Sequence, residues 1–79
     1  MPHYHFDTRD GDKFTEDDEG LDLPDLEAAK RQAALSLAEL ARDVIAGADR
    51  RILIVEVREG SRPVLEARLT FEALLLMER

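Results

Sequence analysis

The segment from Leu26 to Val44 most constrains the fold, because its apolar residues recur at steps of three and four. The stripe consists of Leu26, Ala29, Ala33, Leu37, Leu40, Ala41 and Val44. This spacing gives a helix one apolar face, which must be buried against another element. Asp25 precedes the stripe as an N-cap residue, and Gly47 follows it as a stop signal. We therefore expect one helix over about residues 25–46.

Two strand-like segments precede this helix. Residues 3–8 alternate between polar and apolar side chains, which is typical of a half-buried strand. Asp10-Gly11 favours a tight hairpin turn, and residues 12–15, centred on Phe14, form the expected return strand. We expect Phe14 to anchor this hairpin in the core. A turn over residues 16–20 and a short extended segment then lead to the helix.

Two further strand-like segments follow the helix. Residues 51–58 are rich in β-branched residues, and residues 64–71 alternate between apolar and polar side chains. The order β-β-α-β-β predicts a single α+β domain over residues 1–79, with the helix packed on a four-stranded antiparallel sheet. Counting these four strands along the chain, the expected order is 2-1-3-4. For residues 72–79, periodicity does not separate a strand extension, a short helix and a tail.

The alternation also predicts the two faces of the sheet. The helix is expected to cover Tyr4, Phe6, Leu53, Val55, Val57, Leu65, Ala67, Leu69 and Phe71. The opposite face is expected to carry His3, His5, Asp7, Ile54, Glu56, Arg58, Val64, Glu66 and Arg68. Ile54 on that face and Leu35 on the polar back of the helix are apolar residues without an expected cover. They indicate contact with a second copy, so we expect a homodimer.

Charge is concentrated at the start of the chain. The net charge is −7, and the first 27 residues hold ten acidic and two basic side chains. Such a field disfavours direct nucleic-acid binding and suits a basic protein partner. With no cysteine, no signal-peptide pattern and no apolar run of about 20 residues, we expect a cytoplasmic protein with no membrane segment.

The acidic stretch DTRDGDKFTEDDEG, residues 7–20, does not match a helix–loop–helix calcium site. Counted from Asp10, the fifth and sixth positions are Phe14 and Thr15, where such loops need an oxygen ligand and a glycine. Solvated hairpin turns explain the stretch, since charged residues discourage strand aggregation. The alternative is a docking patch for a basic partner, formed by Glu16, Asp17, Asp18 and Glu19.

His3, His5 and Asp7 share one strand face at spacings of two, which is a spacing that transition-metal ligands can use. Surface histidines on an open sheet face are the competing interpretation. Short loops and the absence of a recognisable nucleophile setting predict no enzymatic activity, no catalytic residue and no cofactor. A metal-binding protein is thus a second alternative function.

Several segments resemble a known family. They are MPHYHFD at the start, DGD at 10–12, DEG at 18–20, LPDLEAA at 23–29 and RPVLEARLTFE at 62–72. Together they resemble an uncharacterised, largely alphaproteobacterial family of short acidic proteins, domain of unknown function family 6894. The resemblance implies a stand-alone cytoplasmic domain and supplies no catalytic residues.

A looser likeness is to the N-terminal domain of HicB-type antitoxins, through Leu23-Pro24-Asp25-Leu26 and the helix start Leu26-Glu27-Ala28-Ala29. It implies an antitoxin-type protein that masks a basic partner. From the residues themselves, we expect a non-catalytic protein-interaction or regulatory module that forms a homodimer. The antitoxin-type protein is the first alternative.

Overall fold

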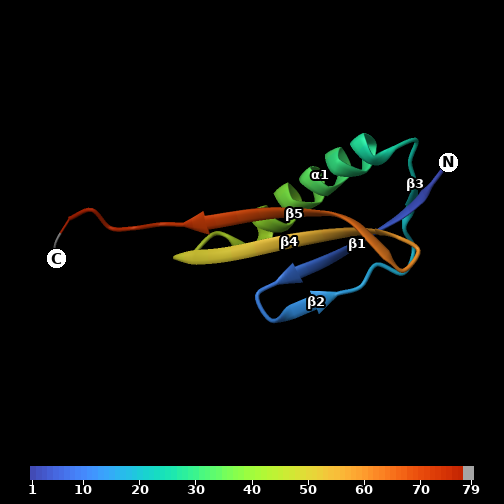
Figure 1. Ribbon diagram of the computed structural model, residues 1–79. Coiled ribbons are helices and arrows are strands. Elements are labelled where there is room, and N and C mark those ends of the chain that lie inside the picture. Colours follow the sequence, from blue (N-terminus) through green and yellow to red (C-terminus); the bar gives the residue numbers. More distant parts are fainter. Residues whose placement is uncertain (78–79) are drawn as a thin grey trace.

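Within residues 1–77, one helix lies across one face of a five-stranded antiparallel sheet (Figure 1). The computed structural model describes residues 1–77. The elements are β1 (His3–Asp10), β2 (Lys13–Thr15), β3 (Leu21–Asp22), α1 (Leu26–Val44), β4 (Arg50–Glu59) and β5 (Arg62–Glu72). The α+β class and the β-β-α-β-β plan are confirmed.

The long strands follow the order β2-β1-β4-β5, and β3 also pairs with β1. The prediction of four strands was therefore one short, because the extended segment after the acidic turn adds β3. Both β2 and β3 lie along the same edge of β1: β2 pairs with residues 8–10 and β3 with residues 3–4. The other end of the sheet is β5, which pairs only with β4 among the described residues.

The helix starts and ends close to the predicted residues. Asp25 caps its N-terminus, with the carboxylate accepting a hydrogen bond from the Ala28 N–H at 2.9 Å. The helix ends at Val44, slightly before the predicted residue 46, and Gly47 then takes a positive φ of 87°. The apolar stripe packs on the sheet, with Ala29, Ala33 and Leu37 buried.

The core is small. The buried apolar residues of the described chain are Tyr4, Ala29, Ala33, Leu37, Leu53, Val55 and Val57. Phe6, Leu65, Ala67 and Leu69 are partly buried against them, as the predicted helix-covered face requires. A domain of this size buries only about 60–65% of its unfolded surface, so an additional interface would contribute much to its stability.

Two residues lie on faces that the alternation did not predict. Phe14 is half exposed, because its pairing with Arg9 places it on the sheet face opposite the helix. There the Arg9 guanidinium lies 5.0 Å from the centre of its ring. Val64 was expected on the open face but packs against the core. A register shift after Val57 inserts an extra residue in β5 at Val64 and changes its direction.

Of the three structures left open for residues 72–79, which were a strand, a helix and a tail, Glu72 belongs to β5 and residues 73–77 form a tail. The Ala73 N–H still donates to the Asp49 carbonyl oxygen at 2.8 Å, and residues 74–77 then extend away from the sheet without strand pairing (Figure 1). Residues 78–79 lie outside the described part of the chain. Leu74, Leu75, Leu76 and Met77 are 72–97% exposed. We call residues 73–77 the apolar tail. Within residues 1–77, no helix has the length and hydropathy to cross a membrane.

Candidate functional site

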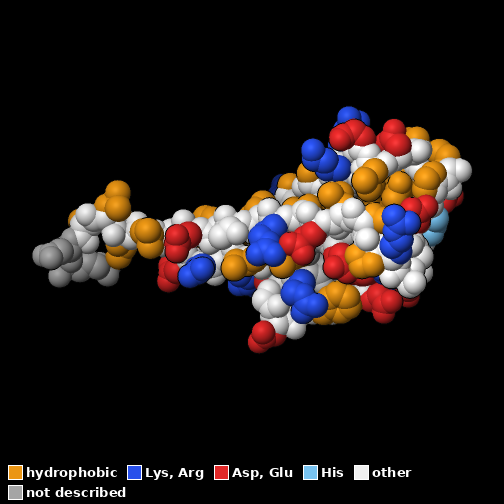
Figure 2. Space-filling view, in the orientation of Figure 1, with side chains coloured by type: hydrophobic (Ala, Val, Ile, Leu, Met, Phe, Trp, Pro, Cys, Tyr) orange, Lys and Arg blue, Asp and Glu red, His pale blue; other side chains and the backbone are white. Residues whose placement is uncertain are grey.

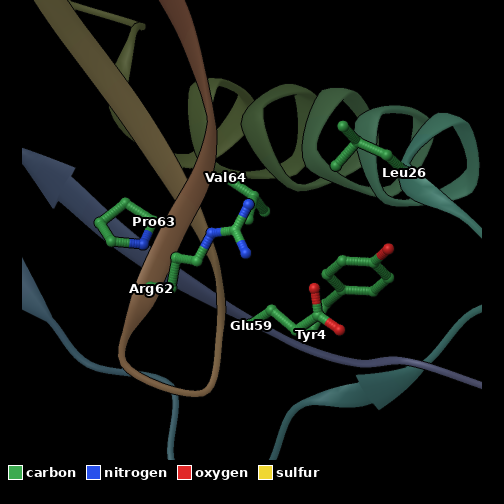
Figure 3. Close-up of a pocket in the computed structure, with 6 residues that line it drawn as sticks. All are labelled: Tyr4, Leu26, Glu59, Arg62, Pro63 and Val64. Carbon is green, nitrogen blue, oxygen red and sulfur yellow. The ribbon is translucent and has the colours of Figure 1, made fainter.

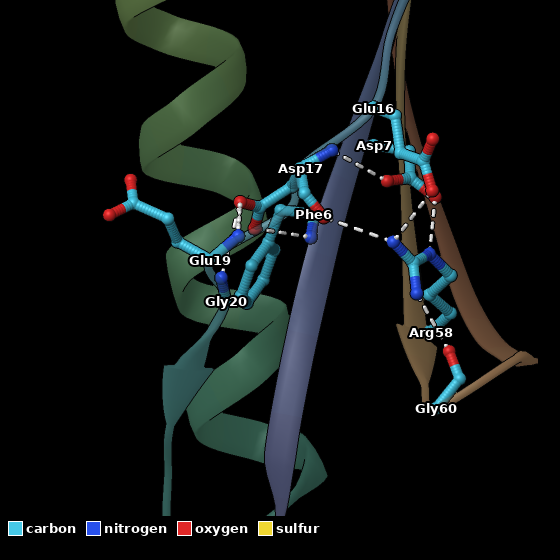
Figure 4. A network of polar contacts seen from close by, with 8 residues as sticks. All are labelled: Phe6, Asp7, Glu16, Asp17, Glu19, Gly20, Arg58 and Gly60. Atoms are coloured by element: carbon cyan, nitrogen blue, oxygen red, sulfur yellow. Dashed lines mark hydrogen bonds and ion pairs between the residues drawn. The ribbon is translucent and has the colours of Figure 1, made fainter.

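The acidic turn is bound to the edge of β1 by Asp17. Its carboxylate accepts hydrogen bonds from the N–H groups of Phe6 at 3.0 Å, Glu19 at 3.1 Å and Gly20 at 3.2 Å (Figure 4). Phe6 lies between the parts of β1 that pair with β2 and β3, so the carboxylate replaces a missing strand partner. Although burial raises the pKa of Asp17, these three donors outweigh it and lower that pKa below its ordinary value.

Asp7 is buried beneath this turn, on the open face of the sheet. Its two carboxylate oxygens accept from the Asp17 N–H at 2.9 Å and from Arg58 Nε at 2.8 Å. Arg58 also donates to the carbonyl oxygens of Gly60, at 2.8 Å, and Asp17, at 3.0 Å. The Asp7 carboxylate raises the pKa of Arg58 above its ordinary value. These contacts join the turn, β1 and β4 in one polar network (Figure 4).

Asp10 makes a second ion pair between β1 and β4. It accepts from Arg51 Nε at 2.7 Å and from Arg51 Nη2 at 2.9 Å, which is a bidentate arrangement. Hydrogen bonding to Arg51 lowers the pKa of Asp10. Together with Asp7 and Asp17, this pair shows that part of the acidic N-terminal charge serves internal contacts.

His3 bonds two acceptors at once. Its Nδ1 donates to the Asp22 carboxylate at 2.6 Å and its Nε2 to the Glu19 carbonyl oxygen at 2.8 Å. Both ring nitrogens must carry a proton to do this, so the geometry is that of an imidazolium ion. Hydrogen bonding to Asp22, followed by that to the Glu19 carbonyl, raises the pKa of His3 above its ordinary value.

The raised pKa predicts a pH dependence of folding. The hydrogen bonds of protonated His3 stabilise the folded state fully below pH 6.5, the ordinary pKa of histidine. This stabilisation is lost as the pH rises through the folded-state pKa of His3. We expect an NMR titration to place the His3 midpoint above 6.5. In Asp22→Asn the midpoint should move back towards 6.5, and unfolding should depend less on pH above that value. The same midpoint in both proteins would contradict this assignment.

The three predicted metal candidates do not form a cluster. His3 and Asp7 are engaged as above, while His5 lies edge-to-face with His3 at 5.0 Å between ring centres. The buried Nδ1 of His5 has no hydrogen-bond partner among the described residues. Across residues 1–77, no group of three or more potential ligands is arranged to hold a metal ion.

The residues predicted to contact a partner are scattered. Asp17 is held inside the turn, whereas Glu16, Asp18 and Glu19 are exposed, and Glu16 also lies 3.4 Å from Arg58. Leu35 is 54% exposed on the back of the helix. Ile54 lies on the other side of the sheet and is partly buried. The structure therefore does not bring these residues together on one surface.

The largest exposed apolar group is at the other end of the chain. The apolar tail follows directly from β5, and Figure 2 shows its hydrophobic side chains projecting beyond the folded body. Sequence reasoning did not assign this segment to the site. The sequence feature that could have pointed to it is the apolar run Leu74-Leu75-Leu76-Met77, which follows the alternating strand segment 64–71.

A hollow of about 340 Å³ lies between the first turn of α1 and the β4–β5 hairpin (Figure 3). It is lined by Tyr4, Leu26, Glu59, Arg62, Pro63 and Val64. Leu26 begins the helix and remains 45% exposed there. The lining thus offers apolar surface beside a carboxylate and a guanidinium.

Residues 3–70 match the family described as domain of unknown function (DUF6894). The chain belongs to this family. No curated protein and no solved structure shows a significant match. The likeness to HicB-type antitoxins gains no support from these comparisons. Membership of DUF6894 covers β1 to most of β5 and leaves the apolar tail outside the matched residues.

Proposed function

We propose that this DUF6894 domain is a non-catalytic protein-interaction or regulatory module that works as a homodimer. The observation that carries the proposal is the 11-residue edge strand β5, which continues into an apolar tail. Stable monomers usually protect such an edge with a cover, a proline or charges. Pro63 and the register shift lie near the start of β5, and the charges within residues 65–72 are of both signs, so this stretch keeps a backbone edge that can pair.

The tail supports self-association by a second route. Exposed, contiguous apolar side chains mark interaction sites more often than they mark free surface. Leu76 is 97% exposed, and burying a leucine side chain in an interface contributes about 1.5–3 kcal/mol. A small core that gains stability from a second copy is consistent with both observations.

Replacing Leu76 with glutamate tests this proposal. The side chain has almost no contacts within its own chain, so we expect the thermal stability of the monomer to be unchanged. We expect the dimer to dissociate at least about tenfold more readily, because both copies lose a buried leucine. Sedimentation velocity over a dilution series measures the dissociation constant.

Leu35→Glu is the matched control, since Leu35 is also exposed but lies on the back of the helix. Its dimer dissociation constant should equal that of the unmodified chain. If Leu35→Glu weakens the dimer and Leu76→Glu does not, the interface lies on the helix and the proposal is wrong.

A further inference from the structure

In β5, residues of opposite charge, and one pair of leucines, stand at equal distances on either side of Ala67. At equal distances on either side stand Glu66 and Arg68, Leu65 and Leu69, and Arg62 and Glu72. In an antiparallel pair related by a twofold axis through Ala67, each residue lies opposite its counterpart. Glutamate would then face arginine twice at the centre of the pair, and leucine would face leucine.

The two faces of β5 keep these groups apart. Leu65, Ala67 and Leu69 are partly buried towards the helix. The side chains of Glu66 and Arg68 are 48% and 55% exposed and pair with each other at 2.8 Å within the single chain, so dimerisation would exchange this exposed pair for two pairs between copies. A twofold axis perpendicular to the sheet keeps both helices on one side. The leucines of the two copies would therefore extend the core, and the ion pairs would form on the open face. Opposite charges on directly paired residues stabilise a sheet.

Other registers are less favourable. A slip by one residue sets the apolar side chains of one copy against the charged side chains of the other. A slip by two residues places Glu66 opposite Glu66 of the second copy, or Arg68 opposite Arg68, and like charges in that position are destabilising. The sequence of β5 thus selects the Ala67-centred register over its neighbours.

This register also gives the apolar tail a place to bind. Antiparallel pairing brings the end of β5 in one copy, Glu72, beside Arg62 at its start in the other. The tail continues from Glu72 and passes the end of the partner's β4–β5 hairpin. The hollow lined by Tyr4, Leu26 and Val64 lies at that end of the domain (Figure 3). Tyr4, Leu26, Pro63 and Val64 supply the apolar part of its lining, beside the charged Glu59 and Arg62, and it is this part that would receive the leucines of the tail.

We propose that two copies pair through antiparallel β5 strands centred on Ala67, with the tail of each copy in the hollow of the other. The proposal rests on the homodimer proposed above and specifies its interface. A continuous sheet of both copies would result, with the helices covering one face.

Cysteine cross-linking tests the register, because the chain contains no native cysteine. A mixture of Glu66→Cys and Arg68→Cys places the two thiols on directly opposite residues. Their Cα atoms should lie about 4.5–5.5 Å apart, which is within disulfide range. In Glu66→Cys alone the two thiols are two residues out of register and separated by more than about 7 Å, which is too far for a disulfide.

After mild oxidation, we expect mass spectrometry to find the mixed covalent dimer at least about tenfold more abundant than either symmetric one. Glu39→Cys, on the exposed helix surface, measures random collisional cross-linking. A sample that is dimeric by sedimentation but lacks the mixed cross-link would overturn this register while leaving the homodimer intact. A sample that is monomeric would overturn both.

Leu26→Glu tests the position of the tail. A carboxylate in the first turn of a helix is electrostatically favourable, so this change should preserve the monomer fold. We expect it to weaken the dimer by at least about tenfold, as Leu76→Glu does, since each change affects one side of the same contact. An unchanged dissociation constant for Leu26→Glu would show that the tail binds elsewhere.

Discussion

Replacing Asp7 with alanine is expected to lower the free energy of unfolding by about 3 kcal/mol. The side chain of Asp7 is only 5% exposed, and it bonds both Arg58 and the Asp17 N–H. Losing one partner of a buried ion pair typically costs about 3–5 kcal/mol. We expect the lower end of that range, because Arg58 keeps the carbonyl oxygens of Gly60 and Asp17 as acceptors.

Chemical denaturation measured by circular dichroism provides the test. Asp12→Ala is the matched control, since Asp12 is exposed in the neighbouring turn. Its effect should stay within about 0.5 kcal/mol. Asp7→Asn keeps an acceptor for the Asp17 N–H but removes the charge, so its effect should fall between the two. Equal stabilities of Asp7→Ala and Asp12→Ala would show that the network does not hold the turn to the sheet.

Gly20→Ala is expected to destabilise the domain by about 2–4 kcal/mol, through two separate effects. Gly20 has a φ of +75°, a conformation that costs other residues about 1–2 kcal/mol. An added Cβ would also lie 2.7 Å from the Tyr4 carbonyl oxygen and 2.6 Å from His3 Nε2. These separations are well inside an ordinary contact of about 3.5 Å, and the carbonyl belongs to paired backbone.

Gly11→Ala separates the two effects. Gly11 has a similar φ of +59°, but an added Cβ there would meet nothing within 4 Å. It should lose only the conformational part, about 1–2 kcal/mol. The same denaturation experiment measures both variants. If Gly20→Ala were no more harmful than Gly11→Ala, the close approach of β3 to β1 would not contribute to stability.

Local sequence signals predicted the helix and the sheet order well. The Asp25 cap, the apolar stripe and Gly47 are all read from neighbouring residues, and each is found in the structure. Phe14 was placed wrongly because its face depends on the register of the hairpin, and a shift of one residue reverses the face. Val64 was placed wrongly because a single inserted residue interrupts the alternation.

The polar network was beyond the reach of sequence patterns. Asp17 bonds Phe6, 11 residues earlier, and Arg58 bonds Asp7, 51 residues earlier. Nothing in the spacing of the acidic stretch distinguishes Asp17 from the exposed Asp18 beside it. The acidic residues therefore looked like one surface, whereas the fold uses Asp7, Asp10 and Asp17 for internal contacts. We therefore propose β5 and the apolar tail, and not the acidic stretch, as the region of association.

The mass of the unmodified chain in solution tests the homodimer most directly. Sedimentation equilibrium over a range of protein concentrations measures that mass without labels or substitutions. We expect a value approaching twice the 8.9 kDa of one chain as the concentration rises. A mass of 8.9 kDa at every concentration would contradict it.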